Sequence, residues 1–173
     1  SSVLTGSEGG IISASATTMS VVNVTGFVAG EILSAKKVSD TGFATEYILI
    51  ESASRTNPSS ESDFQGKLFV QRAFGSGSGG DSGSLGATPN QSQSYNTGQV
   101  IVSTGVSGSG YVRINANPND LATPYIDIVE RTGSGIYDNQ LMVRLGDLTG
   151  LSSGLLFGND NPGFGIFTQN GFF

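Results

Sequence analysis

The stretch from Tyr125 to Arg131 has the sequence Tyr-Ile-Asp-Ile-Val-Glu-Arg, and it gives the clearest indication of the fold. Apolar and polar residues alternate along most of it. Because successive side chains of a strand point to opposite faces, this alternation predicts a β-strand with one face in water. Residues 111–115, Tyr-Val-Arg-Ile-Asn, alternate in the same way. Residues 46–52 are nearly continuously apolar at their centre, which predicts a strand covered on both faces.

Further β-prone runs occur along the whole chain, and no segment has the pattern of a convincing helix. These runs are residues 11–16, 19–24, 31–38, 67–74, 99–104 and 141–145. Between the first two, Ala16-Thr17-Thr18 predicts a tight hairpin. Short strands separated by turn signals such as Asn57-Pro58 predict an all-β fold, either an antiparallel sandwich or an open barrel. We expect a β-domain over residues 1–150, with a Gly/Ser-rich loop at 75–84, followed by an extended aromatic arm over 151–173.

The composition argues against several classes of function. The 173 residues carry a formal charge of −6, which disfavours binding to nucleic acid. The chain contains no Cys and no His, so it lacks a thiolate nucleophile, the usual general base near neutral pH and the commonest transition-metal ligand. No apolar stretch approaches the roughly 18 residues that span a bilayer, so we expect no membrane insertion.

Two motifs in the Gly/Ser-rich loop have a catalytic or phosphate-binding counterpart. Gly80-Asp81-Ser82-Gly83 matches the tetrapeptide around the nucleophile of trypsin-like proteases, but that mechanism needs a His that the chain lacks. A lysine base is the alternative, yet no motif places Lys36, Lys37 or Lys67 beside the serine. A phosphate-binding loop would end in Lys-Ser or Lys-Thr, which this loop does not. We therefore interpret the segment as a linker or surface loop.

Glu46 and Glu51 are the candidate acid and base pair of a glycosidase. Five residues apart on one strand, they point to opposite faces and do not converge on one substrate. We favour a structural interpretation, in which one faces solvent and the other bonds to a neighbouring strand or loop. A pair formed across two chains is the open alternative. The prediction is a protein without catalytic residues or cofactor.

Oxygen-rich clusters and tyrosines offer two further candidate sites. Residues 159–161 (Asn-Asp-Asn) and 117–120 (Asn-Pro-Asn-Asp) carry hard oxygen ligands for Ca²⁺. Neither has the spacing of an EF-hand loop, and such clusters are ordinary turn residues, so we predict no metal and keep Ca²⁺ as the alternative. Tyrosines within the β-runs could stack on sugars, but half-buried packing is the favoured interpretation; they are Tyr47, Tyr111, Tyr125 and Tyr137.

Four segments follow one another in the first part of the chain. They are Phe27-Val-Ala-Gly-Glu-Ile-Leu33, Glu46-Tyr-Ile-Leu-Ile50, Lys67-Leu-Phe-Val-Gln-Arg-Ala-Phe-Gly75 and Tyr95-Asn-Thr-Gly-Gln-Val-Ile-Val102. In this order they resemble a small β-module that recurs in tail-tip, baseplate and fibre proteins of tailed phages. Ala73 stands where that module commonly has Gly after an arginine, and Glu31 where it commonly has Asp. The resemblance implies that the acidic residues and Arg72 fix loops and turns rather than perform chemistry.

The C-terminal part extends the resemblance. Residues 144–151 and 161–173 resemble the lead-in to fibre-shaft segments of large phage tail proteins. The start at Ser1 and the stop at Phe173 are expected for a processed product or a part of a longer protein. An extended, glycine-spaced aromatic arm hides little of itself within its own chain, so we assign assembly to its apolar side chains: Phe164, Ile166, Phe167, Phe172 and Phe173.

The resemblance and the composition together predict a non-enzymatic structural component of a phage tail, in the tail tip or a tail fibre of the virion. It is expected to self-assemble, as a trimer by resemblance, to contact other tail proteins, and to have loops that could bind a glycan or protein of the host surface. The alternative is a cellular, extracellular adhesin or filament subunit that polymerises by lending its arm as a strand to the next copy. A glycan-cleaving tailspike enzyme is the third class, and no repeat architecture supports it.

Overall fold

The computed structural model describes residues 2–5, 11–39, 42–75, 91–118 and 122–171. The chain divides into two compact units, residues 1–106 and 107–173. Both are built from antiparallel strands, which confirms the all-β prediction. Among the described residues the only helical element is the 3-10 helix η1 (Ser153–Leu156).

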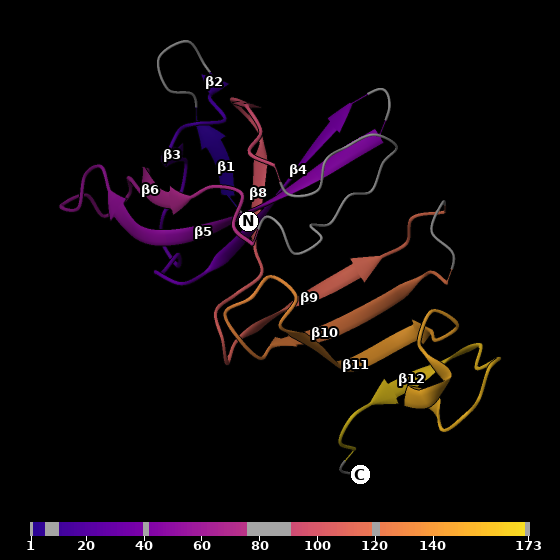
Figure 1. Cartoon of the computed structure of the whole chain (residues 1–173). Coiled ribbons are helices and arrows are strands. Elements are labelled where there is room, and N and C mark those ends of the chain that lie inside the picture. The colour runs from indigo at the N-terminus through magenta and orange to yellow at the C-terminus, as the bar shows by residue number, and fades with distance from the viewer. Residues whose placement is uncertain (1, 6–10, 40–41, 76–90, 119–121, 172–173) are drawn as a thin grey trace. The chain divides into compact units, whose positions relative to one another are not determined.

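The first unit is a six-stranded antiparallel barrel rather than a sandwich (Figure 1). Its strands in spatial order are β1 (Ser2–Thr5), β3 (Thr18–Val21), β6 (Gly66–Gln71), β5 (Gly42–Arg55), β4 (Ile32–Ser39) and β8 (Val100–Ser103). β1 closes the barrel by pairing with β3 on one side and with β8 on the other. A two-stranded ribbon of β2 (Ile11–Ile12) and β7 (Tyr95–Asn96) completes the unit.

The barrel interior is the hydrophobic core of the first unit. In β6 the burial alternates residue by residue, with Gly66, Leu68 and Val70 buried and their neighbours exposed. This is the period of two that a strand with one face in a core requires. The buried apolar side chains of this core cluster come from all six strands and include Leu4, Met19, Val21, Leu33, Ala35, Ile48, Ile50, Leu68, Val70 and Ile101.

The second unit is a four-stranded antiparallel sheet in the order β12-β11-β10-β9 (Figure 1). Its strands are β9 (Gly110–Asn115), β10 (Tyr125–Arg131), β11 (Asn139–Asp147) and β12 (Phe164–Thr168). β12 belongs to the predicted aromatic arm, and it pairs with β11 from Val143↔Thr168 to Asp147↔Phe164. The domain boundary that we expected at residue 150 therefore lies inside this unit, between two strands of one sheet.

The predicted strands recur as observed strands with boundaries shifted by a few residues, but one predicted pairing is wrong. Ala16-Thr17-Thr18 does not join a hairpin, because β2 pairs with β7 while β3 pairs with β1 and β6. The central strand β5 also differs from expectation at its apolar centre. Ile48 and Ile50 are buried, whereas Tyr47 and Leu49 are half-buried, so β5 is fully covered on one face only.

Candidate functional site

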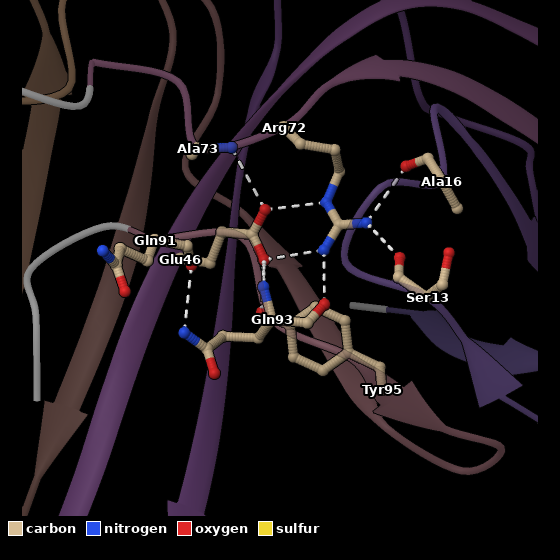
Figure 2. Close-up of polar contacts among 8 residues, drawn as sticks. All are labelled: Ser13, Ala16, Glu46, Arg72, Ala73, Gln91, Gln93 and Tyr95. Atoms are coloured by element: carbon tan, nitrogen blue, oxygen red, sulfur yellow. Dashed lines mark hydrogen bonds and ion pairs between the residues drawn. The ribbon is translucent and has the colours of Figure 1, made fainter.

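Glu46 lies at the centre of a buried polar network in the first unit (Figure 2). Its carboxylate forms a two-pronged ion pair with Arg72, whose Nε and Nη2 atoms lie 2.7 and 2.9 Å from the two carboxylate oxygens. The same carboxylate accepts hydrogen bonds from the backbone N–H of Ala73 at 3.1 Å, from that of Gln93 at 2.9 Å and from the Tyr95 hydroxyl at 2.8 Å. Glu46 is completely buried, so these five bonds replace its water shell.

Arg72 connects this carboxylate to two distant parts of the chain. Its Nη1 atom donates to the carbonyl oxygens of Ser13 and Ala16, at 2.9 and 3.0 Å, in the segment between β2 and β3. Its Nη2 atom also donates to the Gln93 carbonyl oxygen at 2.6 Å (Figure 2). The five guanidinium donors suit such a cluster of fixed oxygens, and bidentate pairing to a carboxylate is the strong geometry for arginine.

Tyr95 completes the network as a hydrogen-bond donor. Burial, and then the neighbouring Glu46 carboxylate, raise the pKa of the Tyr95 hydroxyl well above its ordinary value. The phenol therefore stays protonated, and its hydroxyl donates a hydrogen bond to Glu46. Since the Glu46 carboxylate is completely buried and the Arg72 side chain is only 6% exposed, the arrangement fixes the loops between strands.

Ala73 adopts a left-handed backbone conformation, with φ at +48°. Glycine adopts this region freely, whereas a β-carbon makes it costly. The conformation aims the Ala73 N–H at Glu46. Glu31 fixes a second turn, since its carboxylate accepts from the Val28 N–H and the Ser103 hydroxyl, both at 2.9 Å.

Of the two candidate glutamates, Glu46 is bonded to neighbouring segments and Glu51 is exposed. One glutamate thus faces solvent and the other bonds to neighbouring segments, as expected for this pair. Register shifts between Ile50 and Ser52 mark a bulge at Glu51 in the pairing of β5 with β6.

A second buried ion-pair cluster lies on one face of the β9–β12 sheet. Asp127 in β10 is completely buried, between Arg113 of β9 and Arg144 of β11. Arg144 Nε and Nη2 lie 2.7 and 2.9 Å from the two carboxylate oxygens, and Arg113 Nη2 lies 2.6 Å from Oδ2. The Tyr125 ring lies under both guanidinium groups, with its centre 3.8 Å from that of Arg144. Although burial raises the pKa of Asp127, hydrogen bonds from the two arginines outweigh it and lower that pKa below its ordinary value.

The opposite face of this sheet is apolar and open. Directly paired residues share a face, so the pairing places Ile114, Ile126, Leu145 and Ile166 in one row across all four strands. The adjacent row contains Val112, Ile128, Val143 and Thr168. Phe164 lies beside the first row, where it lines a shallow pocket with Ile114, Ile126 and Leu145. We call these side chains the apolar face.

The apolar face reverses the usual arrangement of a half-buried strand. In β10 the polar residues Asp127 and Arg131 are buried, whereas Ile126 and Ile128 are 39% and 48% exposed. The alternation in residues 125–131 correctly predicted a strand with one face in water, but the wet face is the apolar one. In β9, Val112 and Ile114 are likewise 63% and 74% exposed.

The structure places three of the five predicted assembly residues, and they do not share one face. Phe164 and Ile166 lie on the apolar face, each 69% exposed. Phe167 is paired with Arg144 and points to the opposite side, where it is half-buried. Phe172 and Phe173 lie outside the described residues. Sequence reasoning missed the other members of the apolar face; the signal was the set of β-branched residues at alternate positions of β9 and β10.

The remaining candidates are the Asn/Asp clusters, the protease-like tetrapeptide and the tyrosines of the β-runs. The Asn161 N–H donates to the Asn159 side chain at 3.0 Å, an ordinary Asx turn. In residues 2–5, 11–39, 42–75, 91–118 and 122–171 no group of three His, Cys, Asp or Glu side chains could hold a metal ion. The protease-like tetrapeptide 80–83 and residues 119–120 lie outside those ranges. Tyr47, Tyr111 and Tyr125 are half-buried, and Tyr137 is 50% exposed.

Comparison with known proteins finds no match for this chain among family models, curated proteins or solved structures. Within the described part of the chain, no helix has the length and apolar character needed to cross a membrane.

Proposed function

We propose that this protein is a non-enzymatic structural component of a phage tail, located in the tail tip or a tail fibre, and that it acts by assembling with copies of itself and with other tail proteins. The observation that carries the assembly role is the apolar face, which exposes two cross-strand rows of side chains to water. Contiguous apolar patches larger than a few hundred Å² are rare on soluble monomers and mark interaction surfaces.

The buried ion pairs support a role without catalysis. Glu46 and Asp127, the two completely buried acids among the described residues, are both bonded to arginine and other donors. A general acid or base needs access to its substrate, and these carboxylates have none. Their bonds hold loops and strands in place, as the resemblance to phage tail modules implies.

The placement in a phage tail rests on the order of the four segments between Phe27 and Val102. Two features of these segments support the proposal, namely the ion pair of Glu46 with Arg72 and the left-handed conformation of Ala73. Against the alternative of an adhesin or filament subunit, β12 already pairs with β11 of its own chain, so lending it to another copy would break that pairing.

Immunogold electron microscopy on particles and cells of the source culture tests the proposal. With an antibody against this chain, we expect gold confined to the tips or fibres of phage tails. Gold along cellular filaments or over the cell surface would refute the tail assignment and favour the adhesin or filament. Release of sugars from host envelope material by the purified chain, abolished by changing one carboxylate, would refute the non-enzymatic role.

A further inference from the structure

The apolar face of the β9–β12 sheet is exposed to solvent, although its aliphatic rows resemble the inner face of one sheet of a β-sandwich. Of the eight side chains in its two rows, seven are aliphatic and the eighth is Thr168, so no charge interrupts it. The charged side chains of the central strands, Arg113, Asp127 and Arg144, lie on the other face and bind one another. One face is thus held by internal ion pairs, whereas the two central rows of the other carry no charge, with Glu130 and Asp147 beyond them at the margins of that face.

The size of the face fits a stable interface. Its exposed members range from 39% for Ile126 to 74% for Ile114. Together with Phe164 they expose several hundred Å² of apolar surface, the same order as the roughly 800 Å² that each partner buries in an interface of standard size. Burying such surface removes apolar area from water, which is the main favourable contribution to association.

We propose that the same face of other copies of this chain covers it, so that the β9–β12 sheets of neighbouring copies pack against one another. This inference rests on the assembly role proposed above and names its partner. Faces of β-sheets that carry aliphatic side chains pack on each other about 10 Å apart, and they need no change of backbone to do so. The central rows are free of charge, so two copies meet there without the repulsion expected from a net charge of −6 on each.

The mass of the full chain in solution tests the proposal. Sedimentation equilibrium over a wide range of concentration should give a closed oligomer of the wild type. Ile114→Lys should weaken the association by on the order of 100-fold or more, because like charges would be buried against one another. Val38→Lys is the matched control, since Val38 in β4 is also a β-branched strand residue that is 74% exposed. Circular dichroism should show that both variants remain folded.

Two outcomes would overturn the inference. One is a wild type that stays monomeric throughout the concentration range, which would mean that another protein, or another part of the same chain, covers the face. The other is an oligomer that Ile114→Lys leaves intact, or that Val38→Lys weakens to the same degree, since the interface would then lie elsewhere.

Cross-linking provides a second measurement that does not depend on a disruptive variant. The chain has no Cys, so Ile126→Cys introduces a single thiol at the centre of the apolar face. A short bifunctional thiol reagent should join two copies through Ile126→Cys and not through the control Val38→Cys. Monomeric products from both variants would count against the inference.

These results separate the inference from the proposed function. Copies joined through the apolar face, combined with gold on cellular filaments, would uphold the inference and refute the tail. Gold on phage tails, combined with a monomer that does not cross-link, would uphold the tail assignment and refute this interface.

Discussion

Replacing Glu46 by glutamine removes one charge from the buried network of the first unit without changing the size of the side chain. Arg72, whose side chain is only 6% exposed, would then be a buried cation without its partner. The new amide group would also point its own hydrogens at donors, because the carboxylate oxygens accept five hydrogen bonds from Arg72, Ala73, Gln93 and Tyr95. Removing one partner of a buried ion pair costs about 3–5 kcal/mol. That is a large share of the 5–15 kcal/mol that stabilises a typical domain.

Urea unfolding of the full chain, followed by circular dichroism, measures this cost. Glu51→Gln is the matched control, since it makes the same change to an exposed residue of the same strand. We expect the control to lie within about 0.5 kcal/mol of the wild type. A Glu46→Gln variant within 1 kcal/mol of the control would refute the argument that this network holds the loops of the barrel.

Three other substitutions probe separate features of the two units. Ala73→Gly should raise the free energy of unfolding by about 0.5–1 kcal/mol, because glycine adopts the left-handed conformation without the cost of a β-carbon; urea unfolding that shows a loss of stability would contradict this. Asp127→Asn should destabilise by about 3–5 kcal/mol at neutral pH. Since the folded pKa of Asp127 is lowered, its contribution is complete above the ordinary value of 3.8 and is lost as the pH falls below it. Thermal unfolding at several pH values should therefore show the gap between Asp127→Asn and wild type closing below pH 3.8, and a constant gap would exclude the mechanism. Gly66→Ala should lower the free energy of unfolding by about 1–3 kcal/mol, because its new methyl group would overlap the Ser54 carbonyl oxygen and the Val24 side chain. A variant that melts at the wild-type temperature would show that the strands around Gly66 shift to make room for the methyl group.

The strands could be predicted from sequence because their signal is local. Alternation and β-branched runs located most strands of both units, including all of 125–131. Pairing is not local, since it depends on which strands meet across long separations. The hairpin expected at Ala16-Thr17-Thr18 failed for this reason, as β3 takes its partners from residues 4–5 and 66–69.

The buried networks were predictable only in part. The period of two along a strand predicted that Glu46 and Glu51 point to opposite faces. We expected one of them to face solvent and the other to bond to a neighbouring segment, and the structure shows this arrangement. The partners themselves come from 26 and 49 residues further along, at Arg72 and Tyr95, so no spacing rule could find them.

The apolar face could not be predicted from the alternation of polar and apolar residues. Alternation shows that Ile126 and Asp127 lie on opposite faces, but not which face is covered. Arg113 and Arg144 decide this, since each is paired directly across from Asp127 and both bind its buried carboxylate. An acid at the centre of one strand and arginines at the centres of its neighbours form a pattern that could have revealed the inversion.

The closure of the barrel has a consequence for how the chain folds during synthesis. β1 at Ser2–Thr5 leaves the ribosome well before one of its two neighbours, β8, which begins at Val100. Until that strand emerges, β1 and β4 present unpaired edges, and such edges recruit other chains. Because pairing across such a long separation is slow, the growing chain passes through an interval in which premature contact with a neighbour is the chief hazard.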